Sequence, residues 1–457
     1  MEQKGKNRSY NYMEKEELKQ QMMGLWKTTF HDSDAYIRLV FDTYFDMANI
    51  EYEERDGRVI ASLMAIPYTF GNDNYAINSI YLCGLSTNIR FRKEGIMTSL
   101  LKRIEEKMRD RGYSFMFLIP AEDGLKRYYF DRGFINGFYR SPLHYTSLHD
   151  FRKDYYSTIS EEEKALYKVK AHYFDSLETE ILSISDLSDI EEKIERMEAF
   201  ITECERTQRG FALYQNPEQI RVFLKEALMS GGRISICKNG EGEISGIGLY
   251  SFSETEIREI GRYAINYGSL CKIREAISKN DGGRTMTVYQ LGYEKSNDGK
   301  ALWNPMFSTV LPTATQVGAV GTIERIYNPS QHSKVYGMVR ILSVSEILKF
   351  QANSRNNLKY SILVRLEKTG KVVEFTAKGG SLEEREVKLN NEALLSPEER
   401  NKNARIMYIR DKQGNRRTVM SERDLGELLF RRPSEDRLIE EAFGLPALNG
   451  KISLLLD

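Results

Sequence analysis

Apolar residues recur first at helical spacing and then at strand spacing along the start of the chain. Two stripes predict two helices between residues 14 and 47, formed by Leu18, Met22 and Trp26 and then by Tyr36, Val40 and Tyr44. Ser33 precedes the second stripe and is a plausible N-cap. Residues 51–70 then carry two β-rich runs around Asp56-Gly57, a pair typical of a tight hairpin turn.

The next sixty residues alternate strand and helix patterns. A strand-like run extends from Tyr75 to about Thr87. A helix is predicted from near Gly95 to near Gly112, because every fourth residue is apolar: Ile96, Leu100, Ile104 and Met108. A strand follows from Tyr113, and then a short helix that ends at Gly133. This order is typical of an α/β unit.

A second segment is similar to the first. Residues 234–252 repeat the strand, Gly-rich turn and strand pattern of residues 51–70, and both end in Tyr-x-Phe. Another strand, a helix and the strand MTVYQL follow, which predicts a second copy of the same α/β unit. The copies differ between strand and helix, where the second has Ala264 to Gly268 and no basic cluster. If the first loop binds an anion, the second has lost that capacity.

The last part of the chain has a third pattern. A turn-rich stretch at residues 328–333 indicates a boundary. Beyond it, Ser343 with Glu346 predicts a helix start, and two hairpins are expected at Thr369-Gly370 and at residues 413–415. Ser421 begins another helix, and the chain ends in a strand-like apolar run. This part is interpreted as an α+β unit.

Composition narrows the class of protein. The chain has 457 residues, enough for about three domains, with 41% hydrophobic and 29% charged residues. Its 66 basic and 66 acidic residues cancel, so long-range attraction to nucleic acid or an anionic membrane is not expected. The basic run at residues 400–417 is interpreted as a solvated hairpin face rather than a nucleic-acid site. No window has the ~20 apolar residues of a membrane span.

The cysteines and histidines predict no metal site. The four cysteines lie far apart, without a CxxC pair: Cys83, Cys204, Cys237 and Cys271. The five histidines are equally scattered. We interpret the cysteines as reduced core residues, and we expect a cytoplasmic protein because the N-terminus has no signal-peptide pattern.

The loop from Arg92 to Met97 carries the strongest chemical signal. It joins a strand to a helix, and amides that converge at a helix N-terminus can bind a diphosphate. Gly95 would let a phosphate approach the backbone, while Arg92 and Lys93 add positive charge. The alternative is an ordinary surface loop with two solvated basic residues.

The sequence around this loop resembles the GNAT acetyltransferase family. That family has the motif Arg/Gln-x-x-Gly-x-Gly/Ala, and Arg92-x-x-Gly95-x-Met97 fits it except at the last position. The following helix of the family carries Phe-Tyr-x-x-x-Gly-Phe, and the run from Tyr128 to Phe134 is similar to it.

The layout of the whole chain resembles the Eis (enhanced intracellular survival) acetyltransferases, which have a large apolar residue where Met97 lies. The resemblance implies tandem GNAT folds, α/β in class, followed by an α+β domain like sterol carrier protein 2. The predicted domains are a catalytic GNAT domain (1–153), a GNAT-like domain without the diphosphate loop (154–333) and a sterol-carrier-like domain (334–457). It also implies a homo-oligomer, a hexamer in that family.

The resemblance further implies acetyl-CoA as co-substrate, no metal, and specific roles for residues. The pantetheine would contact backbone groups of Leu85, Ser86 and Thr87. The diphosphate would bind the loop, chiefly through main-chain amides: Arg92, Lys93, Glu94, Gly95, Ile96, Met97 and Thr98. Tyr129 matches the general acid, and the terminal carboxylate of Asp457 matches the general base. Packing for Tyr129 and a solvated chain end for Asp457 are the structural alternatives.

The predicted activity is direct acetyl transfer to a primary amine, such as a lysine side chain, a polyamine or an aminoglycoside. Aromatic and acidic residues cluster at the end of the first helix and in the turn beyond it: Trp26, Phe30, Asp32 and Asp34. They would suit a cationic acceptor, although core packing of the aromatics and helix capping by the acids also explain them. The rival hypothesis is a non-catalytic protein that binds acyl-CoA or an apolar ligand for regulation.

Overall fold

The described residues of this computed structural model form two compact units. The structure describes residues 14–72, 74–158, 173–207, 211–291, 334–355, 357–387, 407–410, 416–430, 448 and 450–451. The first unit comprises residues 1–66 and 81–110, and the second comprises residues 67–80 and 111–457. Strands β2 (Arg58–Asn72) and β3 (Tyr75–Thr87) contribute to both. Each unit is described by itself.

The first unit contains the predicted pair of helices and the predicted hairpin. Besides parts of β2 and β3, the unit contains α1 (Lys15–Phe30), α2 (Asp34–Tyr44), the 3-10 helices η1 (Met47–Asn49) and η2 (Ile89–Phe91), β1 (Ile50–Arg55) and α3 (Ile96–Asp110). The Ser33 side chain accepts a hydrogen bond from the Tyr36 amide and so caps α2. Asp56 and Gly57 have φ values of 51° and 73°, as a tight turn between β1 and β2 requires. These predictions are confirmed.

Helix α3 has the amphipathic character that the sequence predicted. Its apolar stripe is buried: Ile96, Leu100, Ile104 and Met108. On another side, Arg103 pairs with Glu51 at 3.0 Å and with Glu53 at 3.2 Å. Lys107 also reaches Glu51, at 3.2 Å. Burial of the stripe and these pairs hold α3 against β1.

The second unit contains the remaining elements. From β4 to β11 they are β4 (Phe115–Leu118), α4 (Asp123–Phe130), β5 (Ile135–Tyr145), α5 (Phe151–Thr158), η3 (Phe174–Ser176), β6 (Glu178–Leu182), η4 (Ile184–Asp189), α7 (Glu191–Thr207), β7 (Phe211–Tyr214), α8 (Pro217–Met229), β8 (Arg233–Lys238), β9 (Ile244–Phe252), β10 (Glu256–Ala264), α9 (Tyr267–Asn280) and β11 (Thr285–Leu291). The C-terminal ones are β12 (Lys334–Ile341), α11 (Val344–Ser354), β13 (Lys359–Arg365), β14 (Val372–Lys378), β15 (Ser381–Val387), β16 (Met407–Arg410), β17 (Arg416–Ser421), α12 (Glu422–Leu429) and β18 (Gly450–Lys451).

Strand β12 lies between β4 and β5, although about 190 residues separate β5 from it in the chain. Met338 is opposite Leu118 of β4, and Val335 is opposite Tyr139 of β5. On its other edge β5 pairs antiparallel with β11. Within the second unit the sheet therefore continues in the order β4, β12, β5, β11, β10, β9, β8, β6.

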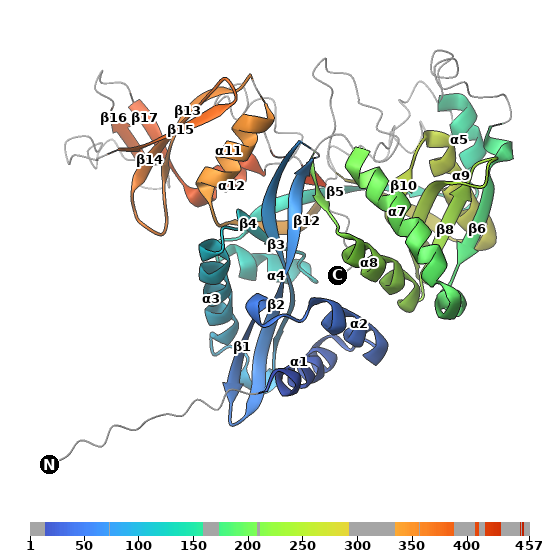
Figure 1. Ribbon diagram of the computed structural model, residues 1–457, viewed down its shortest axis with the longest axis horizontal. Coiled ribbons are helices and arrows are strands. Elements are labelled where there is room, and N and C mark those ends of the chain that lie inside the picture. Colours follow the sequence, from blue (N-terminus) through green and yellow to red (C-terminus); the bar gives the residue numbers. More distant parts are fainter. Residues whose placement is uncertain are drawn as a thin grey trace. The chain divides into compact units, whose positions relative to one another are not determined.

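The segment predicted as a second α/β copy has helices on both faces of its sheet (Figure 1). Ile236 and Leu249 belong to one core cluster, with residues of α7 and α8. Cys237 and Tyr250, the next residues along the same strands, belong to another cluster, with residues of α5 and α9. Alternation along the strands thus supplies both cores. The hairpin, helix and strand predicted here are confirmed.

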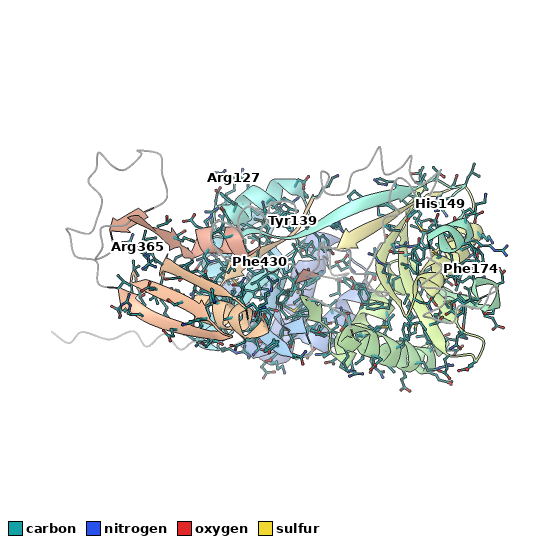
Figure 2. The ribbon with its side chains drawn as sticks, turned by 90° about the horizontal axis from the view of Figure 1, so that it is seen from above. Arg127, Tyr139, His149, Phe174, Arg365 and Phe430 are labelled. Atoms are coloured by element: carbon teal, nitrogen blue, oxygen red, sulfur yellow. The ribbon has the colours of Figure 1, made fainter. Side chains whose placement is uncertain are left out.

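The C-terminal region forms a second sheet in the order β15, β14, β13, β17, β16. Both predicted hairpins are present, and Ser421 with Asp424 forms a capping box at the start of α12. Phe430, which follows α12, packs its ring 5.7 Å from Phe115 and 6.1 Å from Phe138 (Figure 2). The C-terminal region therefore shares a core with β4 and β5. The division at residues 153 and 333 stays a prediction.

None of the described helices combines the length and the hydropathy needed to cross a bilayer. All four cysteines are buried thiols, as predicted.

Candidate functional site

The loop before α3 has an unusual backbone. Lys93 and Gly95 have φ values of 70° and 79°, and Glu94 between them is not in the left-handed region. A side-chain-bearing residue such as Lys93 seldom adopts positive φ, because its Cβ then crowds the carbonyl. Two left-handed residues so close to a helix start turn the loop backbone sharply, and a turn of this kind can direct successive amides toward one anion.

The amides that begin α3 have the freedom that an anion site needs. The first helical bond joins the Ser99 amide to the Gly95 carbonyl at 3.1 Å. Within the described part of the chain, the amides of Gly95, Ile96 and Met97 contact no acceptor. A Cβ placed on Gly95 would meet no atom within 4 Å, so the backbone is open there. The positive end of the helix dipole adds to the attraction for a phosphate.

Side chains around the loop leave it positively charged. The Glu94 carboxylate pairs with Arg55 at 2.8 Å, and the Arg55 guanidinium also lies 5.1 Å from the Phe91 ring centre. Arg92 donates through Nε to the Thr87 carbonyl at 3.2 Å. Lys93 is exposed and has no ion partner among the described residues. Arg55 neutralises the only acid in the loop, a role that sequence spacing did not predict.

The end of β3 is fixed by close packing. Ser86 is buried, and its hydroxyl lies 3.3 Å from that of Ser62. Gly84 has φ of 61°, and a Cβ there would lie 2.3 Å from Cζ3 of Trp26. Only a glycine therefore lets the indole pack against this strand. The pantetheine contacts of Leu85, Ser86 and Thr87 stay a prediction, and the Ser86 side chain already contacts the Ser62 hydroxyl.

The aromatic and acidic cluster at the end of α1 and in the turn beyond it has structural roles. Trp26 is 6% exposed and donates from its indole nitrogen to Asp32 at 2.7 Å. Ser33, not an acid, caps α2. A hydrogen bond from Lys27 holds the pKa of Asp34 below its ordinary value. Core packing explains Trp26, as the structural alternative expected. It was wrong for Phe30, which is 39% exposed, and capping of α2 by Asp32 or Asp34 was also wrong.

Tyr129 lies on α4 in the second unit, with 8% of its surface exposed. Its hydroxyl contacts no polar partner in the described residues. Burial raises the pKa of the Tyr129 phenol above its ordinary value of 10.0, and the neighbouring Tyr128 adds to the rise. The phenol therefore keeps its proton at neutral pH and is able to donate it.

Helix α4 is shorter than the sequence predicted. It ends at Phe130, before the expected end at Gly133, which instead lies in a turn with φ of 84°. The Tyr129 carbonyl accepts hydrogen bonds from the amides of Arg132, at 2.9 Å, and Phe134, at 3.1 Å. Arg340 of β12 donates to the Gly133 carbonyl at 3.2 Å. No sequence signal pointed to Arg340, because its partner lies 207 residues away.

The corresponding helix start in the second copy is closed. The Asn266 side chain accepts from the Ser269 amide and caps α9. Its amide nitrogen donates to the Tyr173 hydroxyl at 2.7 Å. A Cβ on Gly268 would lie 2.8 Å from Tyr155 and 3.1 Å from Tyr173. These side chains occupy the space that the α3 loop leaves open, in agreement with the absence of a basic cluster.

Two other predictions concern the chain end and metals. Asp457 lies outside the described residues, so its role as a base stays a prediction. Of the tail, Gly450 and Lys451 form β18, which pairs parallel with Phe211 and Ala212 of β7. The described part of the chain has no cluster of three or more His, Cys, Asp or Glu side chains arranged to hold a metal ion.

Comparison with known proteins identifies the class. Residues 9–134 match the acetyltransferase (GNAT) domain, and no curated protein sequence matches the chain. The matched segment includes the α3 loop, Tyr129 and Gly133. The protein therefore contains a GNAT domain and is an acyltransferase by class.

Solved structures share the fold over most of the chain. A GCN5-related N-acetyltransferase from Kribbella flavida has a TM-score of 0.56 at 12% identity, covering 97% of this chain and 96% of its own. One from Anabaena variabilis has a TM-score of 0.53 at 10% identity, covering 90% and 87%. Eis1 from Mycobacterium abscessus has a TM-score of 0.51 at 9% identity, covering 94% and 90%. The chain thus has the mixed α/β GNAT acyltransferase fold, with a further C-terminal sheet.

Proposed function

We propose that the protein is an N-acetyltransferase that moves an acetyl group from acetyl-CoA directly to a primary amine. One observation carries the proposal: within the described residues the amides of Gly95, Ile96 and Met97 are unpartnered, and an added Cβ at Gly95 would meet no atom within 4 Å. Such amides suit the diphosphate of coenzyme A. The positive charge of Arg92 and Lys93 complements them.

The proposed chemistry has no acyl-enzyme. The amine nitrogen attacks the thioester carbon, and the C–S bond breaks as the C–N bond forms. Tyr129 gives its proton to the departing thiolate, which its raised pKa permits because the phenol is still protonated at neutral pH. The terminal carboxylate of Asp457 takes the proton from the amine.

Finer features are proposed from the resemblance to Eis acetyltransferases. They are an acceptor such as a lysine side chain, a polyamine or an aminoglycoside, a homohexamer, a cytoplasmic location and a C-terminal domain like sterol carrier protein 2. Eis1 from Mycobacterium abscessus supports this choice by its fold over 94% of the chain. Fold alone does not select an acceptor, so the amine is assigned only as a class.

The test compares two glycines at opposite ends of α3. Gly95 and Gly112 have similar φ values, 79° and 82°, and at neither would an added Cβ have an atom within 4 Å. Alanine at either position strains the backbone by about 1–2 kcal/mol, but only at Gly95 would its methyl group meet a bound diphosphate. We expect Gly95→Ala to weaken acetyl-CoA binding at least about tenfold and Gly112→Ala to leave it unchanged.

Acetyl-CoA binding is measured by calorimetry, and thiol release is followed with a panel of amines, using protein with an untagged C-terminus. Equal affinities of the two variants would exclude the loop as the diphosphate site. Tight binding without thiol release for any amine would favour the rival function, a regulatory protein that binds acyl-CoA without turnover.

A further inference from the structure

The position of Tyr129 depends on the turn that follows its helix. Its carbonyl accepts hydrogen bonds from the Arg132 and Phe134 amides, and the Phe134 ring lies 5.7 Å from the tyrosine ring. Gly133, in this turn, has a left-handed conformation with φ of 84°. A shift of the turn would therefore move the main chain of Tyr129 and one side of its ring.

Arg340 of β12 holds this turn from the C-terminal region. One guanidinium nitrogen, Nη1, donates to the Gly133 carbonyl at 3.2 Å, and Nη2 pairs with Glu367 at 2.7 Å. The Arg340 side chain is 15% exposed, and its bond to the Gly133 carbonyl is partly buried, whereas the pair with Glu367 lies at the surface. A Cβ on Gly133 would be 1.7 Å from Nη1, which means that the guanidinium fills the space beside the glycine. A planar group with two bonds is fixed in direction as well as distance.

The partner of Arg340 is itself anchored. The Glu367 amide donates to the Glu422 carboxylate at 2.9 Å, and Glu422 is the first residue of α12. The next residue, Arg423, places its guanidinium 3.5 Å from the centre of the Phe130 ring. Two arginines from distant parts of the chain thus contact the residues on either side of the turn.

We propose that Arg340 is a positioning residue for acyl transfer, which fixes Tyr129 by holding the Gly133 carbonyl. The inference rests on the proposed function, because it assumes that Tyr129 is the proton donor. It assigns the C-terminal region a part in catalysis that does not require an apolar ligand: β12 and the segment after β13 set the place of a group on α4. Small misplacement of a reacting group has large effects on rate.

The experiment compares Arg340→Gln, Arg340→Lys and a matched control, Arg127→Gln. Arg127 lies on α4 itself and is exposed (Figure 2). It pairs across the helix surface with Asp131 and lies 5.7 Å from the Phe130 ring centre, and neither contact involves the Gly133 carbonyl. We expect Arg340→Gln to lower kcat about tenfold or more and to change KM for acetyl-CoA less than about twofold. Lysine can replace one of the two bonds but not both, so Arg340→Lys should have an intermediate kcat. Arg127→Gln should have the wild-type kcat and KM.

The pH profile separates positioning from a general loss of structure. A loosened turn admits water to the phenol, so the alkaline limb of the kcat profile should move to lower pH in Arg340→Gln. The proposal would be overturned if kcat were unchanged in Arg340→Gln. It would also be overturned if kcat fell together with a rise in KM and the alkaline limb of the pH profile did not shift.

Hydrogen exchange gives a result that does not depend on activity. The Phe134 and Gly133 amides should exchange faster in Arg340→Gln than in Arg127→Gln, since their acceptors belong to the same turn. If the wild type transfers no acetyl group to any amine, the proposed function fails, and unchanged exchange then refutes the role of Arg340 as well. If the wild type is active, unchanged exchange refutes the positioning role alone.

Discussion

Replacement of Gly84 by alanine tests whether Trp26 fixes the end of β3. A Cβ at Gly84 would lie 2.3 Å from Cζ3 and 2.7 Å from Cε3 of the indole. The indole has little room to move, because it donates to Asp32 and packs edge-on against Phe30 and Phe41. Two penalties follow: positive φ for alanine, about 1–2 kcal/mol, and overpacking, about 1–3 kcal/mol. Together they predict a loss of about 2–5 kcal/mol.

Gly57→Ala separates the two penalties. Gly57 has φ of 73°, and no atom lies within 4 Å of its Cβ position, so only the backbone cost remains. The assay is urea unfolding followed by the fluorescence of Trp26, in a Trp303→Phe background because the chain has two tryptophans. The signal then reports the first unit alone, as a multidomain chain requires.

We expect Gly84→Ala to lose about 1–3 kcal/mol more than Gly57→Ala. Equal losses would mean that the indole yields without cost, and the argument that Gly84 exists for close packing would be refuted. A change in the urea dependence of the transition, rather than its midpoint, would indicate that the unfolded state had changed instead.

Two other predictions concern catalysis. Tyr129→Phe should lower turnover about 10²–10⁴-fold with acetyl-CoA affinity unchanged. Because burial raises the pKa of the Tyr129 phenol, wild-type turnover should not fall with rising pH below about pH 10. Rapid-mixing measurements of thiol release test both expectations, and an unchanged rate in Tyr129→Phe would remove the phenol from the mechanism. Extension of the chain beyond Asp457 by a few residues should abolish turnover while the circular dichroism spectrum is preserved, because the α-carboxylate becomes an amide; full activity of the extended chain would exclude the terminal carboxylate as the base.

Local patterns predicted much of the fold. The stripe on α3, the Ser33 cap and the Asp56-Gly57 turn are all present where the sequence placed them. The reason is that each depends on interactions within four residues, so the responsible side chains lie in one short window. The conformation of the Gly95 loop follows the same rule, since a few consecutive φ values set the direction of its amides.

Partners distant in sequence were beyond the reach of such patterns. The Arg55 side chain that neutralises Glu94, and the Trp26 indole that requires Gly84, lie on elements far from their partners in the chain. The three-unit layout also did not predict that β12 enters the sheet between β4 and β5. Nothing in the run from Lys334 to Ile341 distinguishes a strand of one sheet from a strand of another.

The sequence by itself determined the local elements, the helix start that exposes its amides and the tyrosine that precedes Gly133. Only the tertiary structure decided which groups surround them: Arg55 beside the loop, and Arg340 beside the turn, 207 residues from its partner. The physical reason is the range of the forces. Backbone geometry and capping act between near neighbours in the chain, whereas strand insertion and ion pairing depend on how the whole chain closes around its cores.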